Sequence, residues 1–70
     1  MLEPVTDYKQ RIVCYADATT GLIESKYKKQ TTRTVIPVGG TFNIVRDDTE
    51  TEIIKISATA FDIRSFPAVA

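Results

Sequence analysis

Apolar and polar residues alternate along most of this chain, a pattern that is typical of half-buried β-strands. The alternation predicts strands over residues 11–17, 22–27, 31–37, 41–46, 52–57 and 59–66. Thr, Val and Ile are frequent in these segments, and branching at their β-carbons favours a pleated sheet over a helix. Short strands at intervals of about 8–12 residues predict an all-β fold.

Two hairpins follow from the turn residues. In the first, residues 11–17 and 22–27 are joined by a turn in which Asp17 accepts backbone N–H groups and Gly21 supplies a positive φ. No strong turn residue precedes residues 31–37, so this segment is either a separate strand or a continuation of the one before it. Gly39 and Gly40 allow a bend. The second hairpin joins residues 41–46 and 52–57 through a polar tip at 47–50.

We therefore expect a single antiparallel domain over residues 1–70, with five or six strands and a short tail at residues 67–70. A meander or an SH3-like, partly open barrel is the predicted architecture, because closing a sheet on itself protects its edges. A chain of this size buries only ~60% of its unfolded surface, so self-association or a partner is expected to stabilise it. The predicted core residues are Ile12, Cys14, Leu22, Val35, Phe42, Ile44, Ile54, Ile56, Phe61 and Ile63.

Composition argues against several kinds of chemistry. The chain has no His and a single Cys, so one copy offers neither a zinc cluster nor a disulfide, and we expect no metal or cofactor. Catalysis is not expected, because a nucleophile would have no imidazole base. The chain has no apolar run long enough to cross a bilayer and no signal-peptide pattern at its amino end, so we expect a cytoplasmic protein without membrane contact.

Two further features have a structural and a chemical interpretation. Cys14 lies in the middle of a predicted strand, where a buried thiol usually acts as a small apolar side chain; a reactive thiol is the alternative. Asp47, Asp48, Glu50 and Glu52 form the densest acidic stretch. They are expected to be a solvated hairpin tip, with an acidic docking surface as the alternative, since they lack the ligand pattern of an EF-hand.

The strongest sign of function is a basic, aromatic stretch in the first hairpin. Residues 26–33 carry four positive charges and no negative one, although the nine basic and nine acidic residues of the whole chain cancel. Tyr15 is expected to reach the face of Tyr27 across the hairpin, as in binders of single-stranded nucleic acid. The candidate partner-binding residues are Arg11, Tyr15, Lys26, Tyr27, Lys28, Lys29 and Arg33.

Zero net charge and a pI near 6.1 favour a protein partner for this surface over nucleic acid. The sequence thus predicts a non-enzymatic protein that binds another protein or a second copy of itself. Its size is typical of accessory or inhibitory factors encoded by phages or mobile elements. A small nucleic-acid-binding β-barrel that uses the basic patch at residues 26–33 is the alternative.

Overall fold

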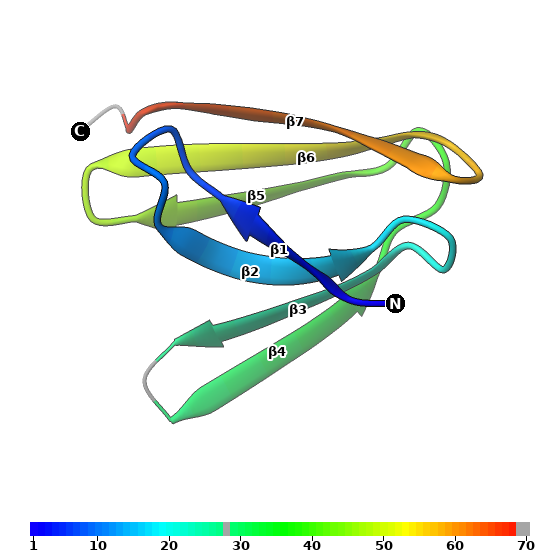
Figure 1. Ribbon diagram of the computed structural model, residues 1–70, viewed down its shortest axis with the longest axis horizontal. Helices are drawn as coiled ribbons and strands as arrows, with labels where there is room; N and C mark the ends of the chain where they lie inside the picture. Colours follow the sequence, from blue (N-terminus) through cyan, green and yellow to red (C-terminus); the bar gives the residue numbers. More distant parts are fainter. Residues whose placement is uncertain (28, 69–70) are drawn as a thin grey trace.

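A computed structural model describes residues 1–27 and 29–68, with the backbone alone for Tyr27. These residues form seven strands, which are β1 (Glu3–Thr6), β2 (Ile12–Asp17), β3 (Leu22–Tyr27), β4 (Gln30–Val35), β5 (Thr41–Arg46), β6 (Thr49–Ser57) and β7 (Ala60–Pro67). The order is β1-β2-β3-β4 in one sheet and β5-β6-β7 in the other, and all neighbours are antiparallel (Figure 1). No helix among the described residues is long and apolar enough to span a membrane.

The predicted all-β class is confirmed, but the predicted strand number and barrel are wrong. The described chain has seven strands in two separate sheets, and these sheets do not close into a barrel. The additional strand is β1, which the alternation did not predict because it is short and contains Pro4. The segment after the first hairpin is a separate strand, β4, which pairs with β3 along its whole length.

Local turn chemistry accounts for the hairpin joining β2 and β3. Gly21 has a φ of 77° and donates its N–H to the Asp17 carbonyl oxygen at 2.8 Å. The Asp17 carboxylate accepts hydrogen bonds from the N–H and the hydroxyl of Thr19, at 3.0 and 2.6 Å. The turn of the second hairpin is shorter than predicted. Asp47 takes a φ of 53° in this turn, and β6 already begins at Thr49.

The core lies between the two sheets. Its buried apolar residues are Val5, Val13, Cys14, Ala16, Ile23, Ile36 and Ile53, against which Phe42, Ile44 and Phe61 pack partly buried. The predicted core is therefore correct for Cys14 and in part for these last three residues.

The predicted core is wrong in several strands because the wrong face was chosen. In β3 and β6 two apolar residues stand in tandem, and Ile23 and Ile53 are buried while Leu22 and Ile54 are only half-buried. A shift of one residue moves every side chain of a strand to the other face of the sheet. The other core residues predicted wrongly are exposed, namely Ile12, Val35, Ile56 and Ile63.

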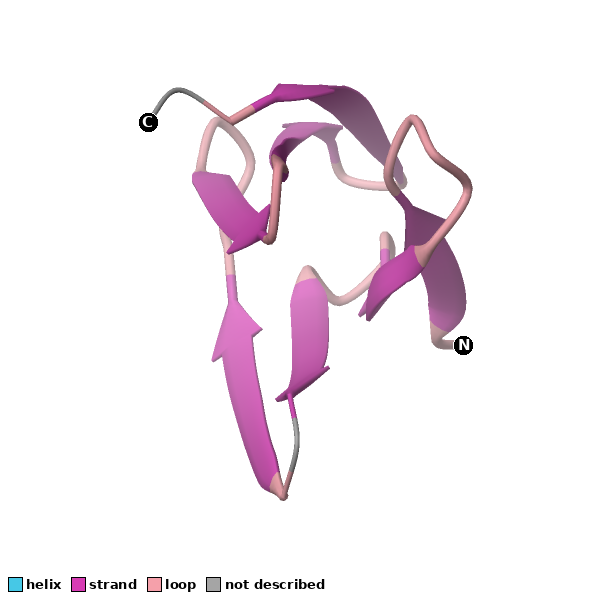
Figure 2. Ribbon diagram, turned by 90° about the vertical axis from the view of Figure 1, so that its left-hand side faces the viewer, coloured by secondary structure: helices cyan, strands magenta, loops and turns pink. Residues whose placement is uncertain are grey.

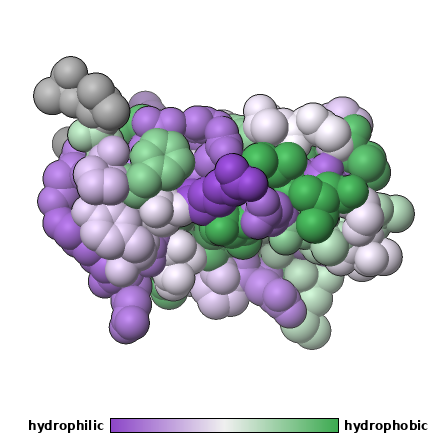
Figure 3. Space-filling view, turned by 90° about the horizontal axis from the view of Figure 1, so that it is seen from above, coloured by the Kyte–Doolittle hydropathy of each residue, from purple (hydrophilic) through white to green (hydrophobic). Residues whose placement is uncertain are grey.

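Ile63 is exposed for a different reason. It lies opposite the fully buried Ile53 and so shares its inward face, but β7 is an edge strand and leaves Ile63 43% exposed. Apolar surface is visible from the β7 side of the molecule (Figure 3).

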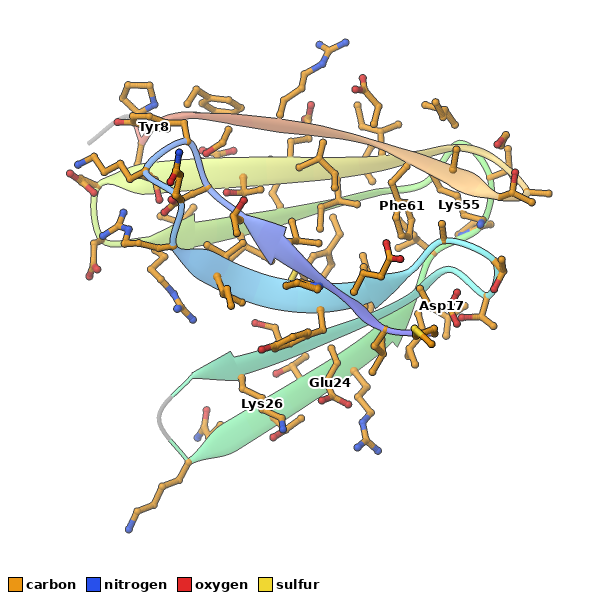
Figure 4. All side chains as sticks on the ribbon, viewed as in Figure 1. Tyr8, Asp17, Glu24, Lys26, Lys55 and Phe61 are labelled. Carbon is orange, nitrogen blue, oxygen red and sulfur yellow. The ribbon has the colours of Figure 1, made fainter. Side chains whose placement is uncertain are left out.

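The inner face of β6 carries polar residues as well as Ile53. Thr49 and Thr51 are fully buried, and Lys55 is 5% exposed. The Lys55 ammonium donates to the carbonyl oxygens of Ala18 and Ala58, and lies 5.5 Å from the centre of the Phe61 ring (Figure 4). Lys55 therefore ties together two turns at one end of the molecule.

Candidate protein-binding surface

The hairpin of β3 and β4 projects from the rest of the molecule (Figure 2). On its outer side the strand register aligns Tyr15 of β2, Glu24 of β3 and Arg33 of β4 in one row. Lys26 follows Glu24 by two residues and therefore shares this side. We call these four residues, Tyr15, Glu24, Lys26 and Arg33, the hairpin face.

Glu24 organises the charges of the hairpin face. Its carboxylate lies 2.9 Å from Nε of Arg33 and 3.7 Å from Nζ of Lys26. The hydrogen bond from Arg33 is the main reason why the pKa of Glu24 lies below its usual value, although burial acts against it. The two basic side chains remain 69% and 63% exposed around a carboxylate that is 11% exposed, so the face presents mixed charge (Figure 4).

The structure brings together only part of the predicted site. Tyr15, Lys26 and Arg33 share the hairpin face, and Lys29 is exposed in the turn. Tyr15 lies opposite Glu24 in the strand register, and its expected reach to the face of Tyr27 stays a prediction. Lys28 and the side chain of Tyr27 lie outside the described residues.

Arg11, also predicted to frame this site, lies elsewhere. Its guanidinium is bound by three carboxylates, at 3.0 Å from Asp7, 3.5 Å from Asp47 and 3.1 Å from Asp48. These contacts place Arg11 beside the turn between β5 and β6. The reason is tertiary, because the partners Asp47 and Asp48 are far from Arg11 in the sequence.

Asp7 is the centre of this second polar cluster, which sequence reasoning missed. Its side chain is fully buried and accepts the N–H groups of Lys9 and Arg11 at 2.9 and 3.0 Å. It also accepts the Arg11 guanidinium at 3.0 Å and the Thr49 hydroxyl at 3.1 Å. Burial raises the pKa of Asp7, but these hydrogen bonds outweigh burial, so the pKa lies below the usual value.

A local signal for this cluster was present in the sequence. An Asp followed by polar residues favours a turn in which its carboxylate binds backbone N–H groups two or more residues later. The segment Asp7-Tyr8-Lys9-Gln10 has this pattern, and Gln10 takes a φ of 65° within the turn.

The acidic tip is partly paired with other residues of the chain, although Asp47 and Asp48 remain 70% and 59% exposed. Asp48 accepts hydrogen bonds from Lys9 and Arg11, and Glu50 accepts the side-chain amide of Asn43 at 2.7 Å. Asp48 is therefore paired with two cations, whereas the amide of Asn43 leaves the charge of Glu50 in place. Across the described chain, no group of three or more acidic or Cys side chains is arranged to hold a metal ion.

Cys14 packs within the core at 1% exposure. Burial raises the pKa of its thiol to about 11, while the positive charge of Arg46 acts weakly in the opposite direction. A thiol with this pKa carries very little thiolate at neutral pH, which is the reactive form. This environment fits the structural interpretation of Cys14.

A cavity of about 320 Å³ lies beside the start of the turn between β5 and β6. It is lined by Ser25, Ile44, Val45, Arg46 and Asp47. The Arg46 guanidinium donates to the carbonyl oxygens of Ile12 and Lys26, each at 3.1 Å, and so links β5 to the separated ends of β2 and β3. Arg46, one of the residues that line the cavity, thus links the two sheets.

Comparison of the chain with protein-family models, curated proteins and solved structures found no match.

Proposed function

We propose that this protein is a non-enzymatic binding protein that contacts another protein through the hairpin face. The observation that carries the proposal is the projecting hairpin, on whose outer side Lys26 and Arg33 lie next to Tyr15 of the neighbouring strand β2. An exposed Tyr supplies contact area at low entropic cost, and Arg is enriched at protein interfaces. The preferred partner presents acidic groups to Lys26, Lys29 and Arg33.

The charge arrangement favours protein over nucleic acid as the partner. Glu24 lies between the two basic residues of the face and would face a phosphate backbone with like charge. Arg11 is engaged by Asp7, Asp47 and Asp48 and does not extend the basic surface. With nine positive and nine negative residues, the chain also lacks the overall positive charge that drives nucleic-acid binding.

The non-enzymatic part of the proposal is supported by the environment of the nucleophiles. Cys14 is buried and its pKa is raised to about 11, which disfavours the thiolate. The Lys55 amine is occupied by the carbonyl oxygens of Ala18 and Ala58. Neither group is placed as a nucleophile beside a base.

The test is affinity capture from a lysate of the source cells, with and without nuclease. Lys26→Gln combined with Lys29→Gln should reduce capture of an acidic protein at least about tenfold, because these side chains would pair with its carboxylates. Arg64→Gln is the matched control, since Arg64 is 66% exposed on the other sheet and pairs only with Asp62 among the described residues. Capture that nuclease abolishes, or that is unchanged in the double variant, would contradict the proposal.

A further inference from the structure

The two open sheets leave four edge strands among the described residues, β1 and β4 in one sheet and β5 and β7 in the other. An exposed edge presents unpaired N–H and C=O groups, and proteins usually block it with proline, a bulge, a charge or a covering segment. β1 has two such features, Pro4 and a bulge between Val5 and Thr6.

The two edge strands of the three-stranded sheet each contact the other sheet or its loops. Beside β5, the Arg46 guanidinium binds the carbonyl oxygens of Ile12 and Lys26. At β7, the Tyr8 N–H donates to the Ser65 hydroxyl at 3.0 Å, which places the loop after β1 against the strand. Each of these edge strands is therefore anchored to another part of the chain.

β4 is the most exposed of the four edge strands. Over Gln30–Val35, all of which the structure describes, the strand has no proline and no break in its register with β3. All of its residues are exposed except the half-buried Thr34. Its one charged residue is Arg33, which pairs with Glu24 of the neighbouring strand β3.

The free hydrogen-bonding groups of β4 can be assigned from the alternation of an antiparallel ladder. Ile36, directly after β4, donates its N–H to Gly21 on the side of β3 at 3.0 Å. Even-numbered residues of β4 therefore bond toward β3, and odd-numbered residues point their N–H and C=O away from it. The free groups belong to Thr31, Arg33 and Val35.

We propose that two copies of this chain pair β4 with β4 in an antiparallel dimer whose two-fold axis passes beside Thr32. In this register Thr31 lies opposite Arg33 of the second copy, and the two Thr32 residues face each other. Cross-strand Thr pairs are favourable, whereas a register centred on Arg33 would place two like charges directly opposite. The register centred on Thr32 is therefore favoured over the one centred on Arg33.

A second copy fits this edge better than an unrelated strand for two reasons. A two-fold pairing uses the β4 edge of both chains and closes, so it leaves no free edge there for further growth. The chain has nine positive and nine negative residues, so two copies do not repel each other through net charge. The inference goes beyond the proposed function, since it rests on the edge of β4 and not on the hairpin face. The dimer would place two hairpin faces on one continuous sheet.

Disulfide cross-linking tests the register. Thr32→Cys should give a covalent dimer under mild oxidation, because facing residues of this kind have Cα atoms about 4.5 Å apart. Thr34→Cys is the matched control on the same strand and face. In the proposed dimer the two Thr34 residues are offset by roughly 13 Å along the strands, beyond the reach of a disulfide. The parent chain, which retains the buried Cys14, should also stay uncross-linked.

Sedimentation equilibrium of the parent chain and of Thr31→Pro gives an independent measurement. Proline at Thr31 removes a free edge N–H without removing a bond to β3, so it should weaken the dimer roughly tenfold or more with an unchanged circular dichroism spectrum. A monomeric parent at high concentration, or equal cross-linking of the two Cys variants, would overturn the dimer. A monomer that still captures an acidic protein through Lys26 and Lys29 would overturn this inference alone and leave the proposed function standing.

Discussion

Gly21 is a residue whose two constraints come from different levels of the structure. Its φ of 77° is required by the turn between β2 and β3. In addition, a Cβ atom at this position would collide with the carbonyl oxygen of Ile36. Ile36 is held close to Gly21, because its own N–H donates to the Gly21 carbonyl oxygen. Gly39 has a φ of 88° but open space around the corresponding Cβ position.

Gly21→Ala should therefore destabilise the protein more than Gly39→Ala. Both variants lose roughly 1–2 kcal/mol from the positive φ, and the collision at Gly21 should add about 1–3 kcal/mol. Urea denaturation monitored by circular dichroism measures the difference in free energy of unfolding. Equal losses in the two variants would show that the contact with Ile36 relaxes freely.

Cys14 allows a second prediction at this scale. Because burial raises the pKa of the thiol to about 11, iodoacetamide at pH 8 should modify the native protein on the order of a hundredfold more slowly than the urea-unfolded chain. Mass spectrometry of timed samples measures both rates. Similar rates in the two states would mean that the thiol is accessible and ionised in the native protein.

The loop between β1 and β2 is the element most dependent on charge. Asp7 binds this loop through two backbone N–H groups and connects it to β6 through Thr49. Asp48, in the turn between β5 and β6, binds Lys9 and Arg11 of the same loop, and the hydrogen bond from Lys9 is the main reason why its pKa is lowered. One loop and one turn are thereby held together by carboxylates.

The protein should lose stability in acid for this reason. Since the folded-state pKa values of Asp7 and Asp48 are lowered, their contribution is complete above the usual value of 3.8 and is lost as the pH falls from there through the folded-state values. Asp7→Asn should lower Tm at pH 7 and make Tm less dependent on pH below about 4. Thermal melts between pH 2.5 and 7 measure this.

Asp62→Asn is the control for this experiment. Asp62 is 41% exposed on β7 and contacts Arg64 at 3.3 Å. Exposed ion pairs contribute little to stability, so this variant should retain the Tm profile of the parent. A similar loss in both variants would argue against a special role for the Asp7 cluster.

At the scale of the whole molecule, charge is balanced both in total and locally. The nine positive and nine negative residues cancel, and the basic residues of the hairpin face surround Glu24. Such a surface can orient an acidic protein partner and still lacks a strong long-range attraction for a polyanion.

Labelled single- and double-stranded oligonucleotides should consequently bind weakly and lose binding at physiological salt. If the oligonucleotides bind at low salt, log affinity should fall with log salt, and the slope should correspond to roughly three to five phosphate contacts. Charge reversal at Lys28 and Lys29 should make this slope less steep. Fluorescence titration at two salt concentrations measures both effects. Micromolar binding that survives physiological salt and is lost in the double variant would instead support a nucleic-acid-binding function.

Local patterns were sufficient to predict much of the secondary structure. The bounds of β3 and β5 and the turn at Gly21 agree with the sequence, because alternation and turn chemistry act between residues that are close along the chain. The inward face of β6 was also predictable in principle. Glu50 and Glu52 mark the even-numbered side as outward, which places Ile53 inside.

Tertiary structure decided the properties that depend on distant neighbours. Lys55 lies on the inner face although it is charged, since carbonyl oxygens from two turns surround its ammonium group. Arg11 does not belong to the predicted basic surface, because it pairs with Asp48, a residue that lies beside it only after folding. The sequence by itself determined the strands and the turn of the first hairpin, whereas the partners of each charge and the open edge of β4 exist only once the two sheets are assembled.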